Sequence, residues 1–193
     1  MSSTQRGYDR HVSDYYITPI RPITEFLEQL MIYEPQVFSD ETLFLDPTAG
    51  GDDEKPMSYP EALKMYGISD EKIITMDIRE DSRAQIKCDY LTRELDFRPD
   101  VIFTNPPFLL AAEVIEKALK DVKPGGFVVM LLRLNFFGSK KRKPLFDKHM
   151  PKYSFVHSRR ISFTADKNTD SIEYQHCVWQ SDHFPAFTKL KVI

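Results

Sequence analysis

The sequence predicts a doubly wound α/β fold, in which helices cover both faces of a mostly parallel sheet. Short continuous apolar runs alternate along the chain with segments whose apolar residues recur at helical spacing. Such runs are typical of parallel strands buried on both faces, and the alternation is typical of crossover connections. Polar, glycine and proline residues directly follow several runs, as expected at the carboxyl edge of such a sheet, where ligands bind.

Seven apolar runs are predicted to form the strands of this sheet. They span residues 42–46, 72–77, 85–88, 101–105, 127–132, 154–157 and 177–180. Their apolar character and short length favour buried strands over helices.

Three helices are predicted, one before the first strand and two between later strands. The first has an apolar face made of Ile23, Phe26, Leu27, Leu30 and Met31. The second is expected to begin at Ser58 in a capping box with Glu61 and to end at Gly67. The third has an apolar face within residues 111–122 and is stopped by the Pro-Gly-Gly sequence at 124–126.

Length and composition fit one globular domain. The chain has 193 residues, of which 41% are hydrophobic and 28% charged. We expect residues 1–193 to form a single domain without a separate target-recognition domain, because the last strands use most of the chain after the fifth. No apolar run approaches the roughly 18 residues of a membrane span. The polar amino terminus lacks the apolar core of a signal peptide, so we expect a cytoplasmic protein.

Neither a disulfide framework nor a metal site is predicted. The two cysteines, Cys88 and Cys177, both lie in strand-like runs, which argues against a disulfide or a cysteine zinc site. The histidines are scattered, and no two have the spacing of metal ligands. They are His11, His149, His157, His176 and His183.

The charge of the chain is unevenly distributed. The net charge is −3, whereas dedicated nucleic-acid binders are often basic overall. Two local spots are nevertheless basic: Lys140, Lys141, Arg142 and Lys143 form one, and the arginines at 159–160 form the other. A local patch can bind phosphate on an acidic protein. We predict that the run at 140–143 contacts phosphates, with a solvated basic loop as the alternative.

Acidic and glycine residues follow the first three predicted strands. The first strand leads into Asp-Pro-Thr-Ala-Gly-Gly at 46–51, where glycines let the backbone approach a ligand closely. Asp77 ends the second strand, where a carboxylate can accept hydrogen bonds from both ribose hydroxyls of a nucleoside. Asp89 follows the third, where it can accept a bond from an adenine amino group. Taken alone, each is also compatible with a turn, a helix cap or a solvated loop acid.

The most specific pattern is Asn105-Pro106-Pro107-Phe108 at the end of the fourth strand. An adenine amino nitrogen is a poor nucleophile because its lone pair is delocalised into the ring. The Asn105 side-chain oxygen and the Pro106 carbonyl can accept both amino hydrogens. They can also stabilise the positive charge that grows on the nitrogen as it accepts a methyl group. The prolines hold the loop in a fixed shape, and Phe108 can stack on an extracted base. The alternative is a proline turn between strand and helix.

These residues resemble the amino-methylating DNA methyltransferases, which have a Rossmann-like fold and use S-adenosylmethionine. The Asn-Pro-Pro-Phe string is similar to their catalytic motif, residues 46–51 to their first cofactor motif, and residues 14–19 to the segment that packs over the methionine end of the cofactor. The resemblance implies a catalytic motif of Asn105, Pro106, Pro107 and Phe108. It implies a cofactor site of Tyr16, Thr18, Pro19, Asp46, Pro47, Gly50, Asp77, Ile78, Asp89, Tyr90 and Asn105.

A closer similarity is to small phage and prophage adenine methyltransferases. It covers residues 50–60, 160–163, 169–170 and 174–179. One departure concerns the first cofactor motif, which usually reads Gly-x-Gly, whereas Gly50 and Gly51 are adjacent here and Asp52 takes the place of the later glycine.

The resulting hypothesis is direct transfer of a methyl group from S-adenosylmethionine to the amino group of a flipped-out adenine in DNA. A protein partner that supplies sequence recognition is compatible with the small size of the chain. Three alternatives stay open: the cytosine amino group, amino methylation of RNA or of protein glutamine, and a catalytically silent fold that binds nucleic acid. Phe136 or Phe137 can either wall the base pocket or pack in the core.

Overall fold

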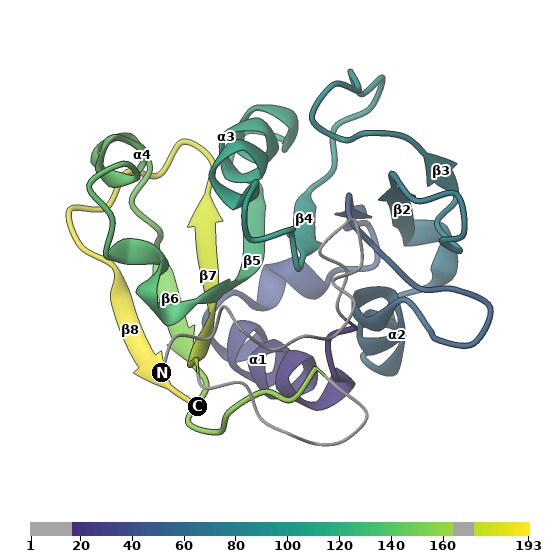
Figure 1. Ribbon diagram of the computed structural model, residues 1–193, viewed down its shortest axis with the longest axis horizontal. Coiled ribbons are helices and arrows are strands. Elements are labelled where there is room, and N and C mark those ends of the chain that lie inside the picture. Colours follow the sequence, from purple (N-terminus) through teal and green to yellow (C-terminus); the bar gives the residue numbers. More distant parts are fainter. Residues whose placement is uncertain (1–16, 164–171) are drawn as a thin grey trace, which may run out of the picture.

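The computed structural model describes residues 17–163 and 172–193, which form one eight-stranded sheet with helices on both faces (Figure 1). The spatial order of the strands is β3-β2-β1-β4-β5-β7-β6-β8. The strands are β1 (Phe44–Asp46), β2 (Ile73–Asp77), β3 (Ile86–Lys87), β4 (Val101–Thr104), β5 (Phe127–Arg133), β6 (Tyr153–Val156), β7 (Tyr174–Gln180) and β8 (Lys189–Val192).

The first five strands pair in parallel, and β7 runs antiparallel to both β5 and β6. From β1 the chain moves outward through β2 to β3 and then returns to the other side of β1 as β4. The strand order therefore reverses between β1 and β4. Ligands of open α/β sheets bind at such a switch point, beyond the carboxyl ends of the strands.

The helices form two layers with the sheet between them (Figure 1). On one face lie α1 (Ile20–Tyr33) and α2 (Ser58–Met65), and on the other lie α3 (Ala111–Asp121) and α4 (Lys143–Lys148). Single 3-10 turns occur at η1 (Pro35–Phe38), η2 (Asp70–Lys72) and η3 (Leu134–Phe137). Each face has its own apolar core, one centred on Phe26 and Phe103 and the other on Ile115 and Trp179.

The predicted fold class is confirmed, with one strand more than the seven expected. The additional strand, β8, pairs in parallel with β6 at the edge of the sheet, and all four of its residues are exposed. Its apolar residues Leu190 and Val192 alternate with lysines and are exposed, unlike the buried apolar runs that identified the other strands.

Two local expectations about helices are wrong. Met31 is 38% exposed, although the other four residues of the predicted apolar face of α1 are buried. The expected capping box does not form, because Ser58 is the first residue inside α2 and makes no capping hydrogen bond; Glu61 pairs instead with Lys64. The predicted end of this helix is confirmed, since Gly67 follows it with a φ of 84°.

Within residues 17–163 and 172–193, no helix has the length and apolar character that crossing a membrane requires. The same residues contain no group of three or more histidine, cysteine or acidic side chains that could hold a metal ion, and Cys88 and Cys177 are free.

Candidate active site

One pocket of about 940 Å³, including its open mouth, lies where β1, β2, β3 and β4 end. The segments after these four strands all reach it, although they are far apart in the sequence. The predicted site residues that line it are Thr18, Pro47, Gly50, Asp77, Ile78, Asp89, Tyr90, Asn105, Pro106, Pro107 and Phe108.

Two predicted cofactor residues are placed differently, and a third is not described. Pro19 is the residue immediately before α1, and it is not among the described residues that line the pocket. Asp46 is buried below the pocket floor and does not line it either. Tyr16 lies outside the described residues.

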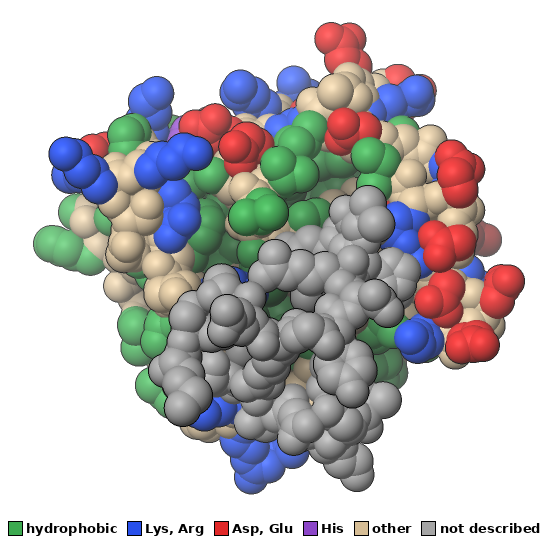
Figure 2. All heavy atoms as spheres, viewed as in Figure 1, with side chains coloured by type: hydrophobic (Ala, Val, Ile, Leu, Met, Phe, Trp, Pro, Cys, Tyr) green, Lys and Arg blue, Asp and Glu red, His purple; other side chains and the backbone are tan. Residues whose placement is uncertain are grey.

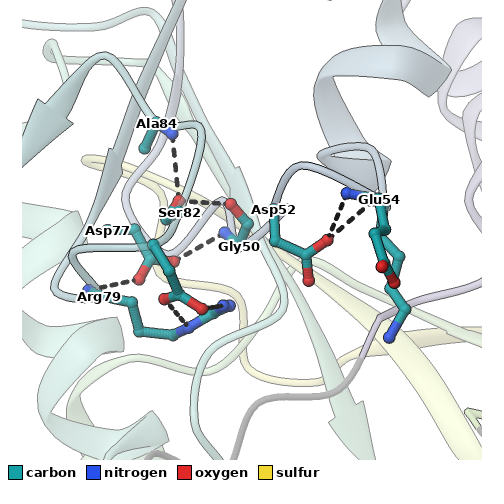
Figure 3. A network of polar contacts seen from close by, with 9 residues as sticks. Gly50, Asp52, Glu54, Asp77, Arg79, Ser82 and Ala84 are labelled. Carbon is teal, nitrogen blue, oxygen red and sulfur yellow. Dashed lines mark hydrogen bonds and ion pairs between the residues drawn. The ribbon is translucent and has the colours of Figure 1, made fainter.

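The loop after β1 is shaped by its two adjacent glycines. Gly50 and Gly51 both adopt positive φ values, 64° and 69°, which side chains rarely tolerate. A Cβ at Gly51 would also lie 2.6 Å from the Met57 side chain. Asp52 accepts hydrogen bonds from the backbone of Glu54 and Lys55 (Figure 3). Asp52, which takes the place of the usual later glycine, therefore stabilises the turn that begins with it.

Asp77 ties the ends of β1 and β2 together at the pocket wall. One carboxylate oxygen accepts a 2.7 Å hydrogen bond from the Gly50 amide, and the other accepts a 2.8 Å bond from the Arg79 amide (Figure 3). A carboxylate has about four acceptor positions, so it can still receive hydroxyl groups of a ligand. Asp77 therefore both holds the loop and offers acceptors to the pocket.

The segment after β3 forms another part of the wall. The Asp89 carboxylate accepts a hydrogen bond from the Leu91 amide at 2.9 Å, which fixes its orientation. The Tyr90 ring is buried with the Lys117 ammonium 4.9 Å from its centre. Ile78 is 62% exposed, so its side chain can cover an apolar ligand surface near the mouth.

The carboxamide of Asn105 is anchored on one side only. Its Nδ2 donates to the Thr18 hydroxyl at 2.9 Å. Its Oδ1 is buried and has no hydrogen-bond partner among the residues that the structure describes. An acceptor in the wall of a pocket that no protein group satisfies is available to a ligand that donates a hydrogen bond.

The backbone of the Asn-Pro-Pro-Phe loop leaves a second acceptor beside the first. The Asn105 carbonyl accepts from the Thr48 hydroxyl at 3.1 Å, and the Pro107 carbonyl accepts from the Leu110 amide at 2.9 Å. The Pro106 carbonyl lies between these two in the sequence, and no residue in the described ranges donates a hydrogen bond to it. The loop thus presents two acceptors at adjacent residues.

Phe108 is held by its neighbours at the pocket. The Arg133 guanidinium lies 4.6 Å from the centre of its ring, and the Tyr174 ring is 5.8 Å away. One face of Phe108 is therefore taken by a cation, which leaves the rest of the ring for a ligand.

Phe136, in contrast, is buried in the core against Phe146, and Phe137 packs there too, so core packing is the outcome for this pair.

Asp46 supports the loop from below. The Thr104 hydroxyl donates to its Oδ1 at 2.6 Å. The same hydroxyl is hydrogen-bonded to the Thr48 hydroxyl, which donates to the Asn105 carbonyl. Its Oδ2 is buried without a hydrogen-bond partner in the described part of the chain. Burial raises the pKa of the Asp46 carboxyl to about 7, and the nearby Asp77 carboxylate adds to this effect, against the hydrogen bond from Thr104.

We predict that Asp46→Asn removes a loss of stability that the wild type undergoes as the pH rises from about 4 to 7. Because the folded-state pKa of Asp46, about 7, exceeds its ordinary value of 3.8, the folded protein binds more protons in this window. The free energy of unfolding should therefore fall as pH rises from about 4 to 7, by up to about 4 kcal/mol. The free energy of unfolding is measured with urea at pH 5 and pH 8. The value for the variant, relative to that for the wild type, should be higher at pH 8 than at pH 5. Parallel pH profiles for the variant, the wild type and the exposed control Asp53→Asn would contradict this account.

Tyr59 is a pocket residue that sequence reasoning missed. It lies on α2, is 3% exposed, and lines the pocket. On an apolar helix face a tyrosine looks like an ordinary core residue. Its hydroxyl partner, His176, is 117 positions away, so no local pattern could have indicated its role.

The predicted basic segment follows η3 at the carboxyl end of β5, the strand next to β4. The Arg142 side chain donates to the Phe136 carbonyl at 2.6 Å and lies over the Phe136 ring, and Lys143 pairs with Asp147. Lys140 and Lys141 are exposed and form no ion pair with any described residue. Figure 2 shows Lys and Arg side chains gathered over α4 and acidic side chains on the opposite side of the view.

Comparison with solved structures identifies the fold as that of class I methyltransferases. A protein described as an RNA methyltransferase from Pyrococcus horikoshii matches with a TM-score of 0.64 and 14% identity over 93% of this chain and 94% of its own. A protein described as a class I S-adenosylmethionine-dependent methyltransferase from Listeria monocytogenes has a TM-score of 0.61 and 14% identity over 92% of this chain.

A third similar structure is a modification subunit of a type I restriction enzyme from Vibrio vulnificus, with a TM-score of 0.57 and 15% identity over 91% of this chain. This chain spans 65% of the Listeria protein and 45% of the Vibrio subunit. No protein-family model and no curated protein sequence matches the chain.

Proposed function

We propose that this protein transfers a methyl group from S-adenosylmethionine to the amino group of adenine in DNA. The observation that carries the proposal is the Asn105 carboxamide: its nitrogen is anchored by Thr18, and its buried oxygen has no partner in the described structure. This arrangement supports a substrate that donates a hydrogen bond at this point of the pocket.

The two acceptors of the loop match the two hydrogens of a planar amino group. When the Asn105 oxygen and the Pro106 carbonyl accept these hydrogens, they draw the nitrogen lone pair out of conjugation and toward the methyl donor. They also stabilise the positive charge that develops on nitrogen. The Thr48 and Leu110 contacts hold the loop backbone beforehand, so little reorganisation remains at the moment of transfer.

The pocket residues fit S-adenosylmethionine, which supplies an electrophilic methyl group when bound. Asp77 would accept the ribose hydroxyls, and Asp89 would accept the adenine amino group. Ile78 and Tyr90 would cover the adenine ring, and the positive-φ backbone at Gly50 permits close approach of the ligand. The methyl group passes directly to nitrogen, so no covalent enzyme intermediate is required.

DNA is favoured as the substrate by the resemblance to phage adenine methyltransferases and by the basic segment at 140–143. One similar structure is described as an RNA methyltransferase and another as a modification subunit of a restriction enzyme, so the fold alone does not choose between the nucleic acids.

We predict that Lys140 and Lys141 bind phosphates. Replacing both with alanine should raise the KM for DNA several-fold at moderate salt and reduce the slope of log affinity against log salt by about 2. The kcat at saturating DNA should change little. Replacing Lys189 and Lys191, on the edge strand β8, provides a matched control. An unchanged salt slope in the Lys140/Lys141 variant would show that this segment is only a solvated loop.

The experiment that tests the proposed substrate uses S-adenosylmethionine labelled in its methyl group. Mixed-sequence DNA, RNA and a protein extract are incubated in parallel with the full chain. Label in DNA is the expected result. Label confined to RNA or protein would keep the chemistry and overturn the substrate, and a protein that fails to bind the cofactor at all would overturn the proposal.

A further inference from the structure

The Arg133 side chain lies beside the aromatic ring that ends the Asn-Pro-Pro-Phe loop. Arg133 is the last residue of β5, the neighbour of β4 in the sheet (Figure 1). Its guanidinium carbon is 4.6 Å from the centre of the Phe108 ring. Phe108 lines the pocket, whereas Arg133 is not among the described residues that do so. The cation is therefore outside the pocket, next to the side chain that is expected to receive the target base.

No residue that the structure describes neutralises this cation. The Arg133 Nε is buried without a hydrogen-bond partner, and the guanidinium forms no ion pair within residues 17–163 and 172–193. Glu173 contacts the adjoining backbone, since its carbonyl accepts from the Leu134 amide, but its carboxylate pairs with Arg160 at 3.3 Å. The guanidinium donors are therefore available to an anionic ligand.

The backbone of Arg133 is held in place by the neighbouring strand. Arg133 pairs with Tyr174 in the antiparallel ladder of β5 and β7, and the Gln175 side-chain amide donates to the Arg133 carbonyl at 3.3 Å. The Tyr174 ring also lies 5.8 Å from that of Phe108. Groups carried by strands are positioned more precisely than groups carried by loops. The cation and the Phe108 ring therefore keep a fixed relative position before a ligand binds.

We propose that Arg133 binds a phosphate of the nucleic acid, next to the nucleotide whose base enters the pocket. This assignment rests on the proposed function, because the anion belongs to the substrate of that reaction. The donors of a guanidinium lie in its own plane, in a geometry that matches two oxygens of one phosphate. Arg133 would thus anchor the sugar-phosphate backbone, while Asn105 and Pro106 bind the amino group.

The position of the cation favours a phosphate over the target base as its partner. A base that stacks on Phe108 has to use the face that the guanidinium leaves open. It would lie at least about 4.5 Å from the ring centre, and thus roughly 9 Å from the cation. Hydrogen bonds reach only about 3 Å. Extrusion rotates a nucleotide about its own backbone, so the flanking phosphates remain outside the pocket, as Arg133 does.

The first test measures binding and requires no methyl transfer. The Kd of the full chain for a labelled, adenine-rich single-stranded oligonucleotide is measured by fluorescence anisotropy over a range of salt concentrations. Arg133→Gln should raise this Kd about 3- to 10-fold at moderate salt. It should also reduce the slope of log Kd against log salt by about 0.7, which corresponds to one phosphate contact. A slope equal to that of the wild type would overturn the proposal.

The matched control is Arg98→Gln, which removes the same charge from the segment before β4, at the opposite edge of the sheet. The Arg98 side chain donates to the Lys120 and Val122 carbonyls and lies far from the carboxyl ends of the strands in the chain's topology. Its Kd for the oligonucleotide and its salt slope should equal those of the wild type. An equal loss of slope in both variants would show a general effect of net charge and would overturn the phosphate contact.

The second test separates the charge of Arg133 from its packing on Phe108. Arg133→Met keeps an unbranched side chain over the ring without the charge, and it should lose as much of the salt slope as Arg133→Gln. Arg133→Lys keeps the charge and should retain most of the slope. If Arg133→Met binds the oligonucleotide as the wild type does, the guanidinium only packs on Phe108 and the proposal is wrong.

Cofactor binding distinguishes the phosphate from the other anionic group available, the carboxylate of S-adenosylmethionine. Because Arg133 is outside the pocket lining, Arg133→Gln should change the Kd for S-adenosylmethionine by less than about twofold. A tenfold rise in this Kd with an unchanged salt slope would assign Arg133 to the cofactor and overturn the proposal. If the slope falls as expected but the wild type methylates no polymer, the proposed function fails and the phosphate contact stands.

Discussion

Asn105→Ala is expected to lower kcat by about 10²- to 10³-fold, which is the usual effect of removing one group that stabilises charge in a transition state. The substitution removes the Oδ1 acceptor, whose interaction with the substrate strengthens as positive charge grows on the amino nitrogen. Cofactor affinity should change by less than about threefold, because most of the predicted cofactor contacts come from Gly50, Asp77 and Asp89. Transfer kinetics and calorimetric titration with S-adenosylmethionine measure the two quantities separately.

The control for this prediction is Asn135→Ala, which changes an exposed asparagine in η3 after the neighbouring strand. Its kcat should stay within about twofold of the wild type, since the side chain is outside the pocket lining. Near-normal turnover by Asn105→Ala, with cofactor bound, would contradict the role of the unpaired Asn105 oxygen.

Asp77→Ala is expected to weaken the binding of the other substrate, S-adenosylmethionine. Loss of a carboxylate that accepts hydrogen bonds should cost about 1.5–3 kcal/mol and raise the Kd for S-adenosylmethionine about 10- to 100-fold. Part of this loss comes from the loop, because the Gly50 and Arg79 amides lose their acceptor too. At saturating cofactor, kcat should be affected much less than in Asn105→Ala.

Asp77→Asn separates these two contributions. It keeps one acceptor oxygen and the shape of the side chain, so its Kd should lie between those of the wild type and the alanine variant. Asp53→Ala, an exposed acidic residue in the loop after β1, should bind the cofactor as the wild type does. Unchanged cofactor affinity in Asp77→Ala would remove Asp77 from the proposed cofactor site.

The carboxyl edge of the sheet was predictable from local patterns in the sequence. Asp77, Asp89 and Asn105 each follow a short apolar run, and parallel strands bring such positions to one edge. The pocket accordingly contains eleven of the predicted site residues. Strand β8 escaped prediction because its alternating exposed residues carry none of the signal of a buried strand.

The parts of the site that depend on long-range packing were not predictable. The histidines at 157 and 176 have no informative spacing in the sequence, yet the antiparallel pairing of β6 with β7 brings their ring nitrogens to 2.8 Å. Asp46 follows the pattern of a cofactor ligand, but whether its carboxyl reaches the pocket or supports the loop from below depends on side-chain orientation. Only the three-dimensional structure supplies that information.

The most direct test of the proposed amino-group chemistry is to identify the methylated nucleoside. DNA methylated by the wild type is digested to nucleosides and analysed by mass spectrometry, with DNA treated by Asn105→Ala in parallel. We expect N6-methyladenine with the wild type and a strongly reduced amount with the variant. Methylation of a ring carbon, such as 5-methylcytosine, would contradict the account, because two acceptors that bind an amino group have no part in that reaction.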